Sequence, residues 1–428
     1  MKQMKVFIYI LVTAFILSSC SIQKRCQAPE LNLPDEIIAG ENDTLTIADM
    51  SWWELYSDST LSKLIKKTLR NNRNMQAAEA HIRQMEELYR VSKASSWPTI
   101  GAQLFADHET NDYYGEKFTK DPEFSLKASL GWEIDLWGSL RWGKRKGAAE
   151  YLASVEAARA MQMTLIAETA TAYFELVALD QELEIVLQTV KTREESVNQA
   201  RLRFEGGLTS ETAYQQAQVE LASASALIPE LEQKIALKEN QIAVLAGEYP
   251  SKVERGEFDL NVGLPENIPI GLPSTLLQRR PDVRQAEQQL QAAMAAVGIA
   301  YADRFPRLTI SLVGGLENDE LKGFFESPFS YVSGNLVAPL LTFGKKKAQY
   351  KASLAAYDEK RFAYEQKVLE VFREVNDAVI TYQKKRRTSE LQLNLFEAAQ
   401  KYVDLAQLQY FNGVIRYIDV LDAHRNFF

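Results

Sequence analysis

The chain has 428 residues, of which 46% are hydrophobic and 25% are charged, so it can fill the cores of two or three ordinary domains. A mean hydropathy of −0.25 excludes a bundle of membrane-spanning helices. The net charge of −8 creates no general attraction to nucleic acid, and we expect no nucleic-acid partner.

The start of the chain has the pattern of an export signal. Lys2 and Lys5 precede an apolar run at 6–17. This run is too short to span a bilayer but suits the hydrophobic part of a signal peptide. The sequence Leu-Ser-Ser-Cys that follows, ending at Cys20, resembles the bacterial lipobox.

The lipobox resemblance implies that the Cys20 thiol is lipidated and that Cys20 is the first mature residue. We therefore expect a lipoprotein signal peptide at 1–19 and a lipidated tether at 20–50, with an ordinary secretory signal as the alternative. Ser21 favours the outer membrane by analogy with other bacterial lipoproteins. The covalent lipid is the only cofactor that we expect, and no metal site is predicted.

Several motifs occur twice, about 206–208 residues apart. Trp97-Pro-Thr-Ile recurs as Phe305-Pro-Arg-Leu, and the segment 200–207 recurs at 406–413. These matches predict two structural repeats, at 51–246 and 274–428, joined by a linker at 247–273 that is rich in proline and glycine.

Each repeat is predicted to contain a β-hairpin, at 97–136 and 305–340. The connecting loops carry turn-forming residues, among them Asn111 and Pro122 in the first hairpin. The stretch FSLKASLGWEIDL at 124–136 alternates apolar residues with small or polar ones. Its apolar side chains, such as Leu126 and Trp132, would share one face and Ser125 and Lys127 the other. Taken alone, such a hairpin also fits a sheet packed on a soluble core.

A very long helix is predicted after each hairpin, because no proline occurs at 123–228 or 340–428. The first would run from about 141 to 204, a rod of about 95 Å. Apolar residues spaced by three and four, including Tyr173, indicate a coiled-coil-like seam.

Tight turns then reverse the chain into return helices. The first turn is predicted at 205–210 and the second at 411–414. Their reversing residues are Gly206, Gly207, Asn412 and Gly413, residue types that accept the left-handed conformation.

An alternating strand of about eleven residues can cross a hydrocarbon core when it is tilted. Strands in a bilayer must close into a barrel, and four strands per chain are too few, since the smallest such barrels need about eight. The two hairpins therefore predict a barrel shared between chains.

The order of elements and several motifs resemble the outer-membrane efflux channel family of the TolC and OprM type. The motifs are WEIDLWG at 132–138, PLLTFGKKK at 339–347 and QYFNGVIRYIDVLDA at 409–423, and WWELYSDSTLSKLI at 52–65 is similar to the lipoprotein branch. The fold class expected from the resemblance is mainly α with a β-barrel contribution. Three chains would share a twelve-stranded outer-membrane barrel that continues as an α-helical tunnel through the periplasm.

The resemblance also implies the function and the partners. The homotrimer would be the passive exit duct of a tripartite efflux system for drugs, metal ions or other small solutes. A periplasmic adaptor and an inner-membrane pump, of RND type, would complete the system. The alternatives are a channel for type I-like protein export and a structural coiled-coil envelope lipoprotein.

In family members, residues matching Asp419, Asp422 and Ile418 line a narrow periplasmic aperture. Three-fold symmetry would turn each carboxylate into a ring of like charges that favours cations. The alternative is that both carboxylates are ordinary exposed groups on a helix surface. Some members carry a gating Arg two residues after the turn glycine, where this chain has Ile415, so the closing ion pair of those members is not expected here.

The sequence contains no catalytic signature, and we do not expect an enzyme. His81, His108 and His424 are scattered and are predicted to be surface residues. Basic runs at 141–146 and 345–347 follow the two hairpins. The two alternatives for these runs are solvated protein surface and contact with lipid headgroups.

The repeat makes one further prediction, about the end of the chain. The first return helix is predicted to end at 246, and its counterpart would fall near 452, beyond Phe428. We therefore expect the second return helix to be cut short, as in a fragment or a truncated product.

Overall fold

The computed structural model describes residue 29 and residues 58–111, 119–256 and 277–427. The predictions for the signal peptide, for Cys20 and for all of the tether except residue 29 lie outside these residues. The chain divides into two compact units, each built from separate stretches of sequence. The first unit takes in 78–159 and 277–369, and the second takes in 58–77, 160–256 and 370–427.

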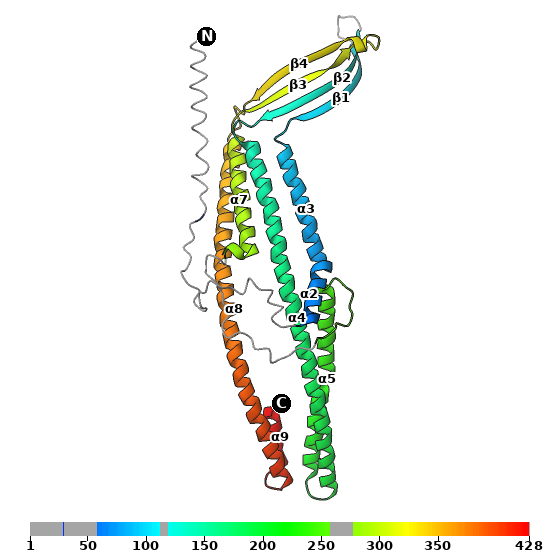
Figure 1. Cartoon of the computed structure of the whole chain (residues 1–428), viewed down its shortest axis with the longest axis vertical. Coiled ribbons are helices and arrows are strands. Elements are labelled where there is room, and N and C mark those ends of the chain that lie inside the picture. The colour runs from blue at the N-terminus through cyan, green and yellow to red at the C-terminus, as the bar shows by residue number, and fades with distance from the viewer. Residues whose placement is uncertain (1–28, 30–57, 112–118, 257–276, 428) are drawn as a thin grey trace. The chain divides into compact units, whose positions relative to one another are not determined.

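The first unit contains a four-stranded antiparallel sheet in the order β1-β2-β3-β4 (Figure 1). Its strands are β1 (Thr99–Asn111), β2 (Thr119–Ile134), β3 (Arg307–Asn318) and β4 (Pro328–Val337). Strands from the two halves of the sequence are joined where β2 pairs with β3. The mainly helical fold with two β-hairpins is therefore confirmed.

The register places apolar and polar side chains on opposite faces of this sheet. Leu126 is opposite Leu104 on one side and Leu316 on the other, so this row is apolar across three strands. One residue further along β2, Lys127 lies on the other face and forms an ion pair of 2.8 Å with Glu317. The alternation predicted for 124–136 therefore describes a sheet with two chemically different faces.

Helices continue directly from the sheet in the first unit. They are the greater part of α3 (Arg73–Ala94), the start of α4 (Ser139–Glu205), α7 (Pro281–Ala302) and the first part of α8 (Lys345–Phe411). α7 packs along α8 through a core that contains Val297 and Tyr350 (Figure 1). α4 and α8 have 67 residues each, a length of about 100 Å per helix.

The second unit holds the remaining parts of α4 and α8 together with α2 (Ser59–Asn71), α5 (Glu211–Leu245) and α9 (Tyr417–Phe427). One core joins α2, α4 and α5 and includes Leu61 and Tyr173, neither of which is exposed at all. A smaller core at Val403 and Ala423 joins α8 to α9. The alternating three- and four-residue spacing places the apolar seam of each helix in these cores.

The ends of two strands differ from the sequence prediction. Asn111 and Pro122 were predicted to lie in a loop, but they belong to β1 and β2, because the hydrogen-bonded register extends to Asn111↔Thr119. The described start of the predicted linker contacts α4, since Arg255 pairs with Asp180 at 2.8 Å. Within the described ranges, none of the helices combines the length and the apolar character needed to cross a membrane.

Candidate channel entrance at the helical-hairpin tips

The first tip turn follows the end of α4 at Glu205. Gly207 adopts a left-handed conformation, with φ of 70°. The amide of Leu208 then donates to the carbonyl oxygen of Arg203 at 2.8 Å, which satisfies one of the last carbonyls of the helix. α5 begins at Glu211, so the structure places Gly206 and Gly207 in the reversal between the two helices.

The second tip turn repeats this geometry between α8 and α9. Gly413 has φ of 72°, and the amide of Val414 donates to the carbonyl oxygen of Gln409 at 2.9 Å. The side-chain amide of Asn412 donates to the carbonyl oxygen of Leu408 at 2.8 Å. Both glycine-containing turns therefore end a long helix through the same left-handed reversal.

The three predicted aperture residues lie on α9 but differ in their surroundings. Ile418 and Asp422 are exposed and one helical turn apart, whereas Val420 and Ala423 pack into the core. Asp419 is half-buried, and its carboxylate accepts a hydrogen bond from the backbone amide of Arg416 at 2.9 Å. Asp419 therefore helps to start the helix.

The Asp422 carboxylate, by contrast, has only two weak contacts in the described residues. The Tyr402 hydroxyl donates to it at 3.4 Å and the Asn426 amide at 3.5 Å. It remains available to water and to passing ions, which is the arrangement that a charged aperture requires.

An ionic cluster that sequence analysis missed ties α9 to α4 and α5. The Glu220 carboxylate binds Arg193 on one side and Arg425 on the other, the latter at 3.0 Å. Burial raises the pKa of Glu220, but the hydrogen bonds from both arginines outweigh it and hold the pKa below its ordinary range. The three residues are too far apart in sequence for any local pattern to reveal the cluster.

His424 lies beside this cluster and is half-buried rather than fully exposed. Gln407 donates to its Nε2 atom at 3.0 Å. Burial lowers the pKa of His424, and the nearby Arg193 cation lowers it further, so the imidazole is neutral at pH 7. His424 and Tyr417 line a small cavity of about 160 Å³ between α4, α8 and α9. Burial raises the pKa of Tyr417 to about 12.

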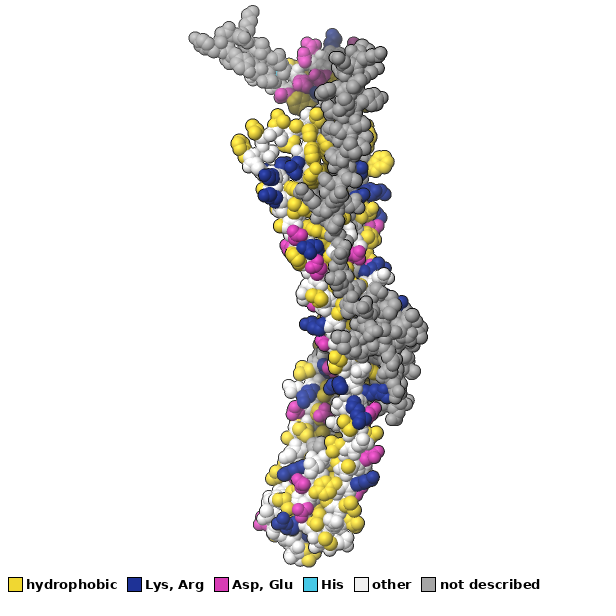
Figure 2. All heavy atoms as spheres, turned by 90° about the vertical axis from the view of Figure 1, so that its left-hand side faces the viewer, with side chains coloured by type: hydrophobic (Ala, Val, Ile, Leu, Met, Phe, Trp, Pro, Cys, Tyr) yellow, Lys and Arg dark blue, Asp and Glu magenta, His cyan; other side chains and the backbone are white. Residues whose placement is uncertain are grey.

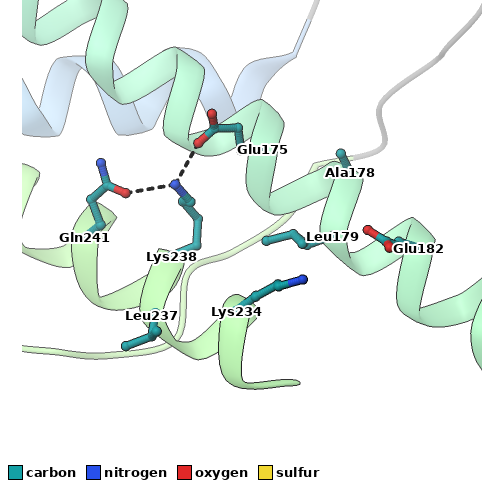
Figure 3. Close-up of a pocket in the computed structure, with 8 residues that line it drawn as sticks. All are labelled: Glu175, Ala178, Leu179, Glu182, Lys234, Leu237, Lys238 and Gln241. Atoms are coloured by element: carbon teal, nitrogen blue, oxygen red, sulfur yellow. Dashed lines mark hydrogen bonds and ion pairs between the residues drawn. The ribbon is translucent and has the colours of Figure 1, made fainter. Parts of the chain in front are cut away.

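A second hollow lies further along α4 and α5 and has a volume of about 500 Å³. Figure 3 shows Lys238 reaching from α5 to Glu175 on α4 and to Gln241. The Lys238 ammonium lies 2.6 Å from a carboxylate oxygen of Glu175. The neighbouring Leu237 is 60% exposed, so this is an open groove with paired charges and an apolar wall rather than an enclosed ligand site.

The site and the fold together define a class of protein. The sheet has one apolar face, its strands continue into helices of about 100 Å, and the helices end in hairpin tips that carry exposed carboxylates. These are the parts of an outer-membrane channel subunit with a long helical extension.

The comparisons with known proteins identify the family. The family described as outer membrane efflux protein matches residues 64–248 and 272–428, and the chain belongs to this family. It is an outer-membrane efflux protein.

Relatives and solved structures agree with this assignment over nearly the whole chain. The antibiotic efflux pump outer membrane protein ArpC of Pseudomonas putida is 28% identical over 99% of this chain and 90% of its own length. The probable outer membrane lipoprotein SilC of Salmonella typhimurium is also 28% identical, over 97% and 91% of the two chains. The outer-membrane channel OprN has a TM-score of 0.86 and 26% identity over 94% of this chain and 93% of its own.

Proposed function

We propose that three copies of this chain form one channel with a twelve-stranded barrel. The observation that carries this proposal is the pair of open edges of the sheet: in the described part of the chain, β1 and β4 each pair with only one neighbour. Every strand has at least ten residues, enough to cross a hydrocarbon core. Unpaired edges cannot persist in lipid, and four strands cannot close, so β4 of one copy would pair with β1 of the next.

The direction of the strands fits this closure. Neighbouring strands in the sheet are antiparallel throughout, so β1 and β4 run in opposite directions. Joining β4 to β1 of another copy therefore continues the antiparallel pattern around the whole barrel. The apolar row at Leu126 would face lipid, and the face with the Lys127–Glu317 ion pair would line a watery interior.

The cargo of this channel would be small solutes that a partner pump supplies. Among the relatives, ArpC is described as part of an antibiotic efflux pump and CusC of Escherichia coli as a cation efflux system protein. We propose that the channel itself is passive and that a periplasmic adaptor and an inner-membrane pump of RND type dock on its helical end. The lipid on Cys20 would anchor each mature subunit in the outer membrane.

The periplasmic aperture would lie at the tips of the second helical hairpins. Symmetry would place three copies of Asp422 around one axis, with Ile418 one turn away on the same helix. The exposure of Asp422 on α9 supports this role. A ring of three carboxylates attracts cations and raises their local concentration at the mouth.

Purified full-length protein in detergent tests the proposal directly. Native mass spectrometry should give the mass of a trimer, and planar bilayers should show cation-selective conductance. Asp422→Asn should lower the cation-over-anion permeability ratio about twofold or more. Asp419→Asn removes a second charge but keeps a side-chain oxygen that can accept the hydrogen bond from the Arg416 amide.

Glu232→Gln is the matched control, because Glu232 is an exposed carboxylate on α5 in the other hairpin. Its permeability ratio should equal that of the wild type. A monomer that stays dissolved without detergent would refute the barrel. Equal permeability ratios in the Asp422 and Glu232 variants would refute the aperture.

A further inference from the structure

Two runs of cations that are far apart in sequence lie where the sheet meets the helices. Lys146 in the first run pairs with Glu150 at 2.7 Å, and six other cations of the two runs remain. Arg141, Lys144 and Arg145 lie in the first turns of α4, and Lys345, Lys346 and Lys347 begin α8. Both groups belong to the first structural unit. We call these six residues the basic collar.

Most of the collar has no counter-charge within the protein. Arg141 pairs with Asp135 at 3.1 Å, and Arg145 stacks on the ring of Trp142 at 4.6 Å. For Lys144 and for the three lysines at 345–347, no carboxylate partner occurs among the residues that the structure describes. At least three uncompensated positive charges therefore adjoin one another at the start of α8.

Their position makes these charges unfavourable within the protein itself. Cations near the start of a helix oppose its dipole, typically at a cost of a few tenths of a kcal/mol each. No acidic residue follows three or four positions later, since 348–351 reads Ala-Gln-Tyr-Lys. An anion outside the chain would provide the compensation that the chain lacks.

Exposed apolar side chains adjoin the collar on the side of the sheet. Leu340 is 89% exposed, Leu341 is 83% exposed and Phe343 is 98% exposed. Phe343 also has φ of 44°, a left-handed conformation that a residue with a Cβ rarely adopts. The backbone of this connection therefore holds an aromatic ring outward, next to the lysines.

The order along the chain is strand, apolar connection and then lysines, which matches the layers of a membrane surface. Apolar and aromatic side chains suit the boundary of the hydrocarbon, and lysines suit the phosphates just outside it. Trp97, in the connection between α3 and β1, is 69% exposed and fits the aromatic girdle of such barrels. On the face drawn in Figure 2, Lys and Arg side chains lie next to hydrophobic ones in the upper part of the molecule.

We propose that the basic collar binds anionic phospholipid headgroups in the periplasmic leaflet of the outer membrane. The chemistry selects a phosphate diester with net negative charge, such as phosphatidylglycerol, over a zwitterionic headgroup. This proposal rests on the proposed function, because it requires the sheet to be inserted in a membrane. It adds a specific lipid ligand and a fixed depth of insertion to the outer-membrane location.

Lipid retention by the purified trimer tests the proposal. Native mass spectrometry would compare bound phosphatidylglycerol with bound phosphatidylcholine for the wild type and for the triple variant K345Q/K346Q/K347Q. Each lysine near an anionic surface contributes a factor of about five, so the triple variant should bind phosphatidylglycerol at least tenfold more weakly. Raising the salt concentration should weaken binding to the wild type in the same direction.

The triple variant K384Q/K385Q/R387Q is the matched control. It removes three positive charges from the middle of the same helix, so it should retain phosphatidylglycerol as the wild type does. Equal retention by both triple variants, or equal binding of the two lipids by the wild type, would overturn the proposal.

A third outcome would also overturn the proposal. If the 345–347 variant fell apart into monomers while its remaining trimers bound phosphatidylglycerol normally, the lysines would form a subunit contact instead. Channel conductance in planar bilayers of phosphatidylcholine separates the two proposals. The collar variant should still conduct there, because loss of the lipid site leaves the duct itself intact.

Discussion

Tyr173→Phe should destabilise the second structural unit by about 3 kcal/mol. The Tyr173 hydroxyl is completely buried; it donates to the Asp58 carboxylate at 2.7 Å and accepts from the amide of Gly256 at 2.9 Å. A hydrogen bond to a charged group contributes about 1.5–3 kcal/mol, and loss of the partner of the half-buried Gly256 amide adds up to about 1 kcal/mol, because water can reach part of it. The substitution removes the hydrogen bonds to Asp58 and from Gly256 and leaves the packing of the ring unchanged.

The effect of this substitution should depend on pH in a defined direction. Burial of the phenol and the hydrogen bond to Asp58 raise the pKa of Tyr173 from its ordinary value of 10 to about 12. A raised pKa means that the folded state favours the protonated phenol, so this stability is fully present below pH 10. It is lost as the pH rises through 12, and two pH units correspond to about 2.7 kcal/mol.

Thermal unfolding of detergent-solubilised protein between pH 7 and pH 12, followed by circular dichroism, measures both effects. At pH 7 the variant should melt about 5–10 °C below the wild type, and the gap should narrow above pH 10. Tyr249→Phe is the control, because the Tyr249 side chain is 92% exposed and should change nothing. A Tyr173→Phe variant that melts with the wild type, or a gap that is independent of pH, would refute the reasoning.

Three glycine substitutions test where the fold has no room for a Cβ atom. In Gly315→Ala, the new Cβ would lie 2.1 Å from the carbonyl oxygen of Leu126, so β2 and β3 cannot stay paired; in Gly314→Ala the nearest atom is 3.6 Å away. Heat-modifiable migration in gels should be lost only in the Gly315 variant, and loss in both would contradict the prediction. In Gly298→Ala, the Cβ would lie 2.3 Å from the ring of Trp142, which should cost at least about 1–3 kcal/mol in thermal unfolding; an unchanged melting temperature would exclude that close approach.

Periodicity was sufficient to predict the sheet and the long helices. A period of two residues over 124–136 predicted which side chains share a face, and the pairing of Leu126 with Leu104 and Leu316 confirms it. Strand ends were less predictable, because Pro122 reads as a turn residue but lies within β2. Pairing with β1 outweighs the turn preference of Pro122. Proline lacks the amide hydrogen, but a strand tolerates it where that hydrogen would not be needed for pairing.

The contacts that fix the second unit could not be predicted in the same way. Arg193, Glu220 and Arg425 come from three helices, and local spacing carries no information about which charged faces meet. The same holds for Asp58, whose partner Tyr173 is separated from it by 115 residues. Such contacts follow from the tertiary packing, so only the folded chain reveals them.

The two hairpin tips show how a duplicated backbone can carry unequal chemistry. At an offset of 206 residues, Gly207 corresponds to Gly413, and their φ angles of 70° and 72° are nearly the same. Each return helix has one acidic residue in its first turn, Glu211 in α5 and Asp419 in α9, but the positions differ. The counterpart of Asp419 is Ala213, which is only 7% exposed.

The counterpart of Asp422 is the uncharged Gln216. The two repeats therefore share the turn and the buried alanines that follow it, Ala217 in α5 and Ala423 in α9, exposed by 2% and 0%. Helix packing alone would accept the same polar residues in both halves. Asp419 has a structural role at the start of α9, whereas the exposed Asp422 has none and has no charged counterpart in the first half. The fold does not require Asp422, and the aperture proposed at the second hairpin would give it a physical reason.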